Sequence, residues 1–228
     1  MLGDPFEFSI PNWAPALIRN QNENRVEQMP QEMIEVWARS FQQMRKLVFV
    51  NCWYSGDRDS AAMWATFGSP QDGAAVRSTV ARLSESIILD RDAVVGEVAY
   101  FDYSLTEAPP EAASVVWNDG LNLAYMKRDA FGYEQEVRAV FRDGAKKESP
   151  GVSIPVDLTR LVAEVTVAPF AEQWFVDLVE GYLNQAGISV PVGRSKIGDE
   201  PNWRLSVPPG LQHLPVMQFG SPLTPPDS

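Results

Sequence analysis

The chain has 228 residues, of which 45% are hydrophobic and 11% aromatic, enough to build one sizeable core. Its 30 acidic and 19 basic residues give a net charge of −11, and a surface this acidic repels phosphate backbones and anionic membranes, which argues against nucleic-acid binding as the main role. Cys52 is the single cysteine and His213 the single histidine, so an intrachain disulfide is excluded and a histidine-based metal site or Ser-His-Asp triad is disfavoured.

The first part of the chain predicts a loop, a helix and a strand. Residues 1–7 are rich in turn signals, and Asp4 before a proline favours extended backbone. A helix is predicted over 31–47, where the apolar positions follow helical spacing at Ile34, Trp37, Ala38 and Phe41. Residues 47–53 are β-branched and aromatic, which is typical of a buried strand.

Four shorter elements are predicted next. Ser60 is the expected N-cap of a short helix that ends at Gly68. Residues 73–79 predict a strand, and residues 79–88 predict a helix. One continuous strand is expected over 94–103, with its first face formed by Val94, Gly96, Val98 and Tyr100.

The middle of the chain predicts a loop over 104–112, a helix over 114–126 and a strand over 134–142. The strand is expected to end at the turn Asp143-Gly144. A further strand is predicted over 161–167, with the core-facing positions Leu161, Ala163, Val165 and Val167.

Pro169 opens the clearest helix of the chain. Its expected apolar stripe consists of Phe170, Trp174, Leu178, Val179, Tyr182 and Leu183, and Gly187 is the expected stop. A short strand is predicted over 188–192, and proline, serine and glycine dominate after residue 198. Because strands and helices are interspersed without clean alternation, we predict an α+β fold: a single domain over 1–198 with a mixed, mainly antiparallel sheet and packed helices, followed by a Pro-rich tail over 199–228.

The segment 133–142 carries the strongest chemical signal. Alternation at the strand period would place Glu134, Glu136 and Arg138 on one face. Two neighbouring carboxylates push their pKa values apart, which suits acid–base chemistry or hydroxyl binding, and Arg138 would keep one of them ionised. The alternative is a solvated strand face with cross-strand ion pairs. Lys127 and Tyr133 add to this polar group as candidate ligand-binding residues.

Other candidates lie at the ends of predicted elements. Trp53 follows Cys52 at the end of a strand, a common place for functional side chains, although without a nearby histidine the thiol itself is predicted to be inert. Trp64 could offer an aromatic wall to a planar ligand, with core packing as the alternative. Arg77 could bind a phosphate or carboxylate through two hydrogen bonds, or form a surface salt bridge.

Several function classes lack their motifs in this sequence. It contains no GxGxxG, GxxxxGK[ST], HExxH or CxxC pattern, which removes P-loop enzymes, dinucleotide-fold dehydrogenases, zincins and zinc ribbons. There is also no apolar run near the ~20 residues of a membrane span, and no secretory signal. A cytoplasmic protein without a membrane segment is expected.

Five segments resemble a large bacterial family known as a domain of unknown function. They are Gly3-Asp4-Pro5-Phe6-Glu7, Cys52-Trp53, Met63-Trp64-Ala65-Thr66-Phe67-Gly68, Gly73-Ala74-Ala75-Val76, and Lys127-Arg128 with Phe131, Glu134, Glu136 and Arg138. The family motifs are Asn-Asp-Pro-Phe-Glu, Cys-Trp, Met-Trp-x-x-Tyr-Gly, Gly-Val-Ala-Ile and Phe-x-x-Glu-x-Glu-x-Arg. The first box usually follows roughly 25 further residues in that family, so the resemblance implies a copy shortened at its N-terminus.

The order of these motifs is loosely similar to that of ADP-ribosyltransferases. That analogy implies that Glu136 holds the ribose hydroxyl of NAD, that Glu134 orients the acceptor, and that Trp64 or Phe67 stacks on nicotinamide. The first hypothesis is therefore a stress or phage-defence enzyme that acts on a nucleotide, with NAD as the candidate. The second is a non-catalytic binding or sensor domain for an anionic small molecule or a protein, and the third is a purely structural strand.

Overall fold

The computed structural model describes residues 4–15, 31–88, 93–114, 121–143 and 151–200. The chain divides into two units, Met1–Ile197 and Gly198–Ser228. Most of the Pro-rich tail, His213, and the side chains of Ile34, Trp37 and Ala38 lie outside this description. In the part of the chain that it covers, no helix is both long and apolar enough to cross a membrane.

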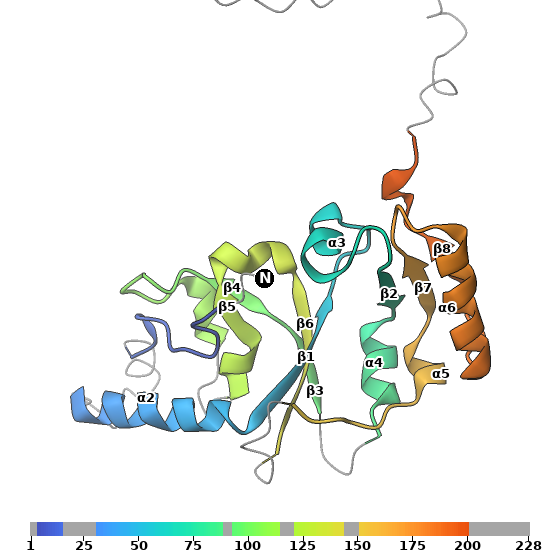
Figure 1. Ribbon diagram of the computed structural model, residues 1–228. Helices are drawn as coiled ribbons and strands as arrows, with labels where there is room; N and C mark the ends of the chain where they lie inside the picture. The colour runs from blue at the N-terminus through green and yellow to red at the C-terminus, as the bar shows by residue number, and fades with distance from the viewer. Residues whose placement is uncertain (1–3, 16–30, 89–92, 115–120, 144–150, 201–228) are drawn as a thin grey trace, which may run out of the picture. The chain divides into compact units, whose positions relative to one another are not determined.

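The first unit contains α-helices, 3-10 helices and short strands (Figure 1). The α-helices are α2 (Gln31–Arg45), α3 (Ala61–Phe67), α4 (Val80–Ser86), α5 (Leu158–Leu161) and α6 (Gln173–Gln185). The strands are β1 (Val48–Tyr54), β2 (Ala74–Arg77), β3 (Val94–Glu97), β4 (Ala99–Phe101), β5 (Met126–Arg128), β6 (Glu136–Arg142), β7 (Glu164–Val167) and β8 (Val192–Arg194). The 3-10 helices are η1 (Pro110–Ser114), η2 (Leu121–Tyr125), η3 (Asp129–Glu134) and η5 (Lys196–Gly198).

The described strands form two three-stranded sheets and one two-stranded sheet. In the first, β6 lies between β1 and β3, and both pairings are antiparallel. In the second, β7 pairs antiparallel with β2 and parallel with β8. The third sheet joins β4 and β5 in parallel. The predicted α+β class with mainly antiparallel pairing is confirmed.

Local sequence signals explain where the helices α3 and α4 begin. Ser60 caps α3, because its side chain accepts a hydrogen bond from the Met63 amide. Thr79 caps α4 in the same way through the Arg82 amide. The helices predicted after these two residues, and the strands predicted on either side of α3, are confirmed. The burial predicted for β1 is wrong, because Val50, Asn51 and Cys52 in its middle are exposed.

Three predicted strands need correction. The strand over 94–103 is broken at Val98, whose amide donates to the Glu136 carbonyl oxygen at 2.9 Å before the chain turns into a different sheet. The strand over 161–167 begins only at Glu164, because Leu161 ends α5. The strand over 188–192 is displaced to β8.

The helix predicted over 114–126 is also wrong in its described part. Residues Leu121–Tyr125 form a 3-10 helix, and Met126 already belongs to β5. This early start of β5 matters for the site, because it brings Lys127 into a short buried strand.

The apolar stripe predicted for α6 is largely on its outer side. Phe170, Trp174, Leu178 and Tyr182 are 61%, 58%, 44% and 68% exposed. The inner side instead uses Phe175, Val176, Val179 and Leu183, which pack against the core clusters around β7 and β8. The prediction is right for Val179 and Leu183 and wrong for the other four residues, because α6 carries apolar residues on two faces and helical spacing alone does not select between them.

Two glycines of the α6 region provide a matched test of backbone conformation. Gly187 has φ +69°, whereas Gly181 lies within the helix, and a Cβ atom at either position would meet nothing within 4 Å. Gly187→Ala is therefore expected to lower the free energy of unfolding by about 1 kcal/mol, and Gly181→Ala to raise it by about 1 kcal/mol. Urea unfolding of dilute protein measures both, and two changes of the same sign would contradict the assignment.

Separate core clusters pack the helices onto the two three-stranded sheets. Leu83 of α4, Ala139 of β6 and Leu161 of α5 form one cluster, with Trp53 packed against it. Trp64 of α3 packs separately on Val167 of β7. These contacts fix the elements that surround the candidate site.

Candidate functional site

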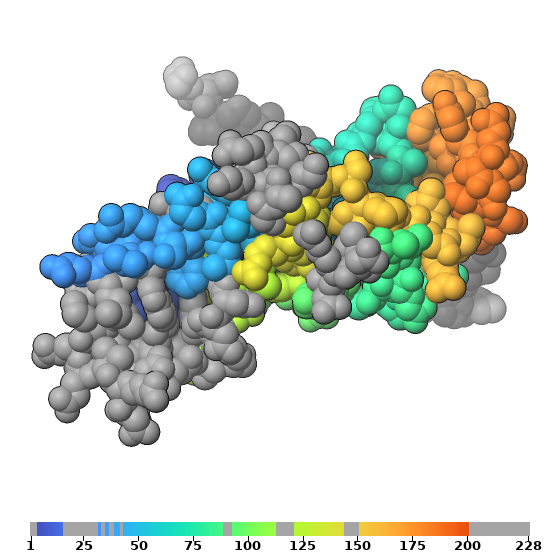
Figure 2. Space-filling model, turned by 90° about the horizontal axis from the view of Figure 1, so that it is seen from below, coloured from blue at the N-terminus to red at the C-terminus, as the bar shows by residue number. Residues whose placement is uncertain are grey.

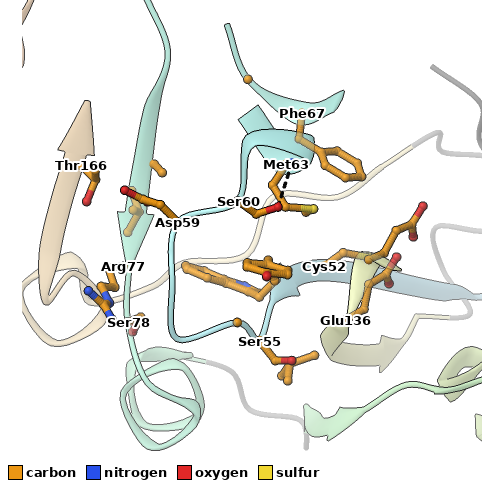
Figure 3. Close-up of a pocket in the computed structure, with 18 of the residues that line it drawn as sticks. Cys52, Ser55, Asp59, Ser60, Met63, Phe67, Arg77, Ser78, Glu136 and Thr166 are labelled. Carbon is orange, nitrogen blue, oxygen red and sulfur yellow. Dashed lines mark hydrogen bonds between the residues drawn. The ribbon is translucent and has the colours of Figure 1, made fainter. Parts of the chain in front are cut away.

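A cleft of about 1390 Å³ is lined by residues of both three-stranded sheets and of α3. Figure 3 shows Met63 and Phe67 of α3 on one side of it, facing Cys52 of β1 and Glu136 of β6. Arg77 of β2 lies on the wall across the cleft from Cys52 and Glu136. The cleft therefore joins a mainly apolar roof to walls that carry charged side chains.

Lys127 links the two carboxylates that the sequence singled out. Its Nζ atom donates to Oε2 of Glu134 and, at 2.9 Å, to Oε1 of Glu136. The three residues are at most 8% exposed, and all three line the cleft. Two acidic groups and one cation thus meet at one end of the cleft.

Arg138 completes this group from the middle of β6 and is only 1% exposed. Its Nε donates to Oε2 of Glu136 at 2.5 Å, and Nη1 donates to the Ala124 carbonyl oxygen at 2.7 Å. Nη2 donates to Oε1 of Glu7, which lies 131 positions earlier in the sequence. Five charged side chains therefore form one connected network, the charged cluster: Glu7, Lys127, Glu134, Glu136 and Arg138.

The backbone explains how Glu134 and Glu136 come together. The prediction that both lie on one strand face is wrong, because Glu134 ends η3 and the strand starts at Glu136. Gln135 between them adopts a left-handed conformation with φ 40°. This turn replaces strand alternation as the reason why both carboxylates reach Lys127 of β5.

An N-terminal clasp, residues 4–7, bonds to the cluster and contributes two carboxylates to the lining of the cleft. Asp4 accepts two hydrogen bonds from Arg128, at 3.1 and 2.5 Å, and one from the Phe6 amide at 2.9 Å. The Arg128 guanidinium lies 5.1 Å from the centre of the Phe6 ring. The pair Asp4–Arg128 anchors the clasp and lets Glu7 reach Arg138.

The two carboxylates of the cluster have opposite pKa shifts. Burial acts to raise the pKa of Glu136, but hydrogen bonds from Glu134, Arg138 and Lys127 outweigh it and lower the pKa to about 2. Burial raises the pKa of Glu134, and the hydrogen bond to Glu136 raises it further, while Lys127 acts in the opposite direction. Glu136 is thus the anion of the pair, and Glu134 is the member that holds a proton more readily.

This difference predicts an acid transition. Because the folded pKa of Glu136 lies below its ordinary value of 4.5, its contribution to stability is complete above about pH 4.5 and is lost as the pH falls toward 2. The raised pKa of Glu134 acts in the opposite sense, since it contributes stability at low pH that is lost as the pH rises.

Urea unfolding between about pH 2 and pH 6 measures the acid transition. The free energy of unfolding of the wild type should fall with decreasing pH more steeply than that of Glu136→Gln. Equal slopes for the two proteins would contradict the assignment of Glu136 as the anion.

Cys52 lies beside this cluster but is not set up as a nucleophile. Its thiol opens onto the cleft, opposite Arg138 in the β1–β6 register. Burial by the surrounding protein raises the pKa of the thiol to about 12, although Arg138 acts to lower it. The thiol is therefore neutral near pH 7, and thiolate chemistry is disfavoured.

Neither a metal site nor a comparison with known proteins assigns a function to the cleft. In the described ranges, no group of three or more His, Cys, Asp or Glu side chains is arranged to hold a metal ion. No family model, curated protein or solved structure matches the chain. The chemistry of the cleft is therefore argued from its own residues: a carboxylate pair, neighbouring cations and aromatic side chains.

The remaining predicted site residues divide into those that line the cleft and one that does not. Trp64 and Trp53 line it, but Trp64 is mostly buried against β7 and Trp53 packs on the Leu83 cluster. Arg77 also lines it, donates to the Asp57 carbonyl oxygen at 3.0 Å and pairs with a neighbouring glutamate. Tyr133 is 49% exposed and lies outside the cleft lining.

Sequence reasoning missed the contribution of the clasp to the site. The sequence predicts a loop over residues 1–7 and a family-like box at Gly3-Asp4-Pro5-Phe6-Glu7, but no contact to Arg138. The available signal was the unusual density of acidic and aromatic residues around a proline in this opening segment. The side chain of Glu7 in this segment is the fifth member of the charged cluster.

Proposed function

We propose that this protein is a bacterial cytosolic enzyme that acts on a nucleotide, with NAD as the candidate substrate, by chemistry of the ADP-ribosyltransferase type. One observation carries the proposal: Glu134 and Glu136 meet Lys127 at one end of a cleft whose roof presents the half-exposed Phe67. A stress or phage-defence role is the biological setting that we propose for such an activity.

The size and lining of the cleft suit a dinucleotide. Ligand pockets for drug-sized molecules are roughly 300–1000 Å³, so a cleft of about 1390 Å³ has room for a larger ligand. Phe67 can stack on a nicotinamide or purine ring, whereas the buried face of Trp64 is less available for stacking. Arg77 and Arg194 on the β2–β7–β8 wall can bind the pyrophosphate.

The proposed reaction begins with the ionised Glu136. Its carboxylate accepts a hydrogen bond from a ribose hydroxyl and stabilises positive charge on the ribose ring. The bond between C1′ and the nicotinamide nitrogen breaks, and its electron pair leaves with nicotinamide. An acceptor, water or a side chain, then forms the new bond at C1′ and loses its proton to the solvent, while Glu134 orients that acceptor.

The rest of the charged cluster would prepare Glu136 for this role. Lys127 and Arg138 keep it ionised and fix both of its oxygens before a ligand arrives. Each carboxylate oxygen has a second lone pair, so a ribose hydroxyl can still donate to it. The resemblance of the sequence motifs to a bacterial family, and of their order to ADP-ribosyltransferases, supports the same proposal by analogy.

Incubation with NAD tests the proposed activity. The wild-type protein is expected to release nicotinamide faster than buffer alone, with ADP-ribose or an ADP-ribosylated protein as the second product. Chromatography of the reaction over time measures both products. Absence of nicotinamide release between about pH 5 and pH 9, a range in which Glu136 is ionised, would remove the enzyme proposal.

A non-catalytic binding or sensor domain is the second candidate. The observation that favours it is the complete pairing of the cluster, since both oxygens of Glu136 already accept hydrogen bonds from buried cations. A binding domain predicts that ADP-ribose or another anionic ligand raises Tm without being consumed. A Tm increase with NAD that is not accompanied by nicotinamide release would favour this candidate over the enzyme.

A further inference from the structure

Arg138 is buried in the middle of its strand, yet it borders the cleft. Figure 2 shows yellow residues of β6 on the face seen from below, in keeping with the exposed Arg142 at the end of the strand. Arg138 also lines the cleft, but it is only 1% exposed. Its guanidinium is therefore already desolvated in the folded protein, and an anion that reaches it meets a positive charge that water screens little.

The guanidinium has more hydrogen-bond donors than the described residues use. Arginine carries five N–H groups, and in the described part of the chain those of Arg138 have three acceptors: Glu136, Glu7 and the Ala124 carbonyl oxygen. Buried polar groups are normally paired, so the donors that remain indicate room for a further acceptor. A phosphate group suits them, because guanidinium groups commonly bind phosphate through two parallel hydrogen bonds.

Glu7 is the acceptor of Arg138 that is most easily replaced. Its side chain is 32% exposed, and in the described ranges its carboxylate bonds no other side chain. Glu136, in contrast, is also held by Lys127, and the Ala124 carbonyl oxygen belongs to the backbone of η2. An ion pair with one partly exposed member contributes little to stability, so the Glu7 carboxylate can give way to another anion.

The chain on both sides of Glu7 is anchored independently of its carboxylate. Asp4 pairs with Arg128, and its side chain is 1% exposed. Phe8 has a positive φ of 65° and packs in the core cluster around Trp13. A bulky residue keeps such a backbone conformation only where its surroundings hold it. The Glu7 side chain can therefore turn away from Arg138 while the clasp stays in place.

The balance of charge favours an anion as the replacement. The cations Lys127 and Arg138 face three carboxylates, of which Glu134 has a raised pKa because of its burial and holds a proton more readily. Glu136 and Glu7 then balance the two cations. If Glu7 turns toward the solvent, one buried positive charge lacks its partner, and a bound phosphate restores the balance.

We propose that Arg138 is an anion-binding position of the cleft, which Glu7 occupies until a phosphate group of a ligand replaces its carboxylate. Arg77 lies on the wall across the cleft, so this position is separate from the one proposed for the pyrophosphate. The proposal goes beyond the proposed reaction, because it concerns binding alone and holds whether or not NAD is cleaved.

Titration of the full chain with inorganic phosphate, followed by phosphorus NMR, tests the proposal. Glu7→Gln is expected to lower the dissociation constant of phosphate roughly fivefold or more, because it removes the anion that competes for Arg138. Glu7→Asp, whose shorter side chain reaches Arg138 less well, should lower it too. Glu97→Gln is the matched control, since it removes an exposed carboxylate elsewhere in the cleft and should change the constant by less than about twofold.

Titration with ADP-ribose distinguishes the source of the phosphate. Tighter binding of ADP-ribose to Glu7→Gln than to the wild type would assign the position to a phosphate of a nucleotide, and a gain for inorganic phosphate alone would assign it to the free ion. Circular dichroism checks that each variant is folded.

Three results would overturn the proposal. One is a dissociation constant that is unchanged or raised in Glu7→Gln, as expected of an ion pair with a purely structural role. Another is an equal gain in Glu97→Gln, which would reduce the effect to overall charge. The third is the absence of phosphate binding to folded Glu7→Gln up to roughly 10 mM, a concentration at which even a weak site is occupied.

Discussion

Replacing Arg138 with alanine is expected to lower the free energy of unfolding by about 3–5 kcal/mol. The guanidinium is almost fully buried and bonds Glu136, Glu7 and the Ala124 carbonyl oxygen. Its removal leaves a buried carboxylate and a buried carbonyl oxygen without these donors, and an uncompensated buried charge is one of the most destabilising changes in a protein. Urea denaturation followed by circular dichroism measures the loss.

Arg142→Ala is the matched control for this prediction. Arg142 ends the same strand, but it is exposed, and a surface arginine contributes little to stability. Its replacement is expected to change the free energy of unfolding by less than about 0.5 kcal/mol. Similar values for Arg138→Ala and Arg142→Ala would contradict the description of the charged cluster as a buried, connected network.

Glu136→Gln is expected to reduce nicotinamide release from NAD roughly 100-fold or more, as is typical when a group that stabilises transition-state charge is removed. Glutamine has nearly the same shape, yet it carries no negative charge to stabilise a cationic ribose. Because the change affects the transition state more than the ground state, we expect a fall in kcat with a smaller change in KM. The assay is run at a temperature at which circular dichroism shows the variant to be folded.

Two further variants separate a role in the reaction from a general effect on the cleft. Glu97 also lines the cleft but is exposed and belongs to β3, so Glu97→Gln should retain wild-type activity. Glu136→Asp keeps the charge on a shorter side chain and should recover part of the activity that glutamine loses. Full activity in Glu136→Gln would exclude this residue as the carboxylate that acts on ribose.

Elements with strong local signals could be predicted from the sequence. The caps Ser60 and Thr79 mark the starts of α3 and α4, and Gly187 marks the end of α6, because these residues satisfy backbone groups or adopt a left-handed conformation that few others tolerate. The strand β1 was equally clear from its β-branched and aromatic residues.

Elements whose limits depend on distant partners could not be predicted. The sequence around Val98 has the pattern of one continuous strand. The Val98 amide, however, donates a hydrogen bond to the Glu136 carbonyl oxygen, and the residues after it pair with β5. Helical spacing found the apolar residues of α6 without showing which of two apolar faces meets β7, since periodicity does not tell a core face from an exposed face.

The convergence of charges near residue 136 was predicted only in part. Alternation led to Glu136 and Arg138, and the density of polar residues led to Lys127. The left-handed Gln135, which brings Glu134 to the same lysine, leaves no recognisable pattern in the sequence. The contact between Glu7 and Arg138 joins residues 131 positions apart, which no local pattern encodes.

The ion pairs Glu7–Arg138 and Asp4–Arg128 have a consequence for the order in which contacts form during synthesis and folding. Glu7 and Asp4 leave the ribosome long before Arg138 and Arg128, their partners 131 and 124 positions later. Contacts of such high sequence separation form slowly, because a long segment must be closed into a loop first. The contacts of the clasp should therefore be among the last to form. In a nascent or partly folded chain, Arg138 would lack its hydrogen bond to Glu7 and would be less firmly positioned beside Glu136.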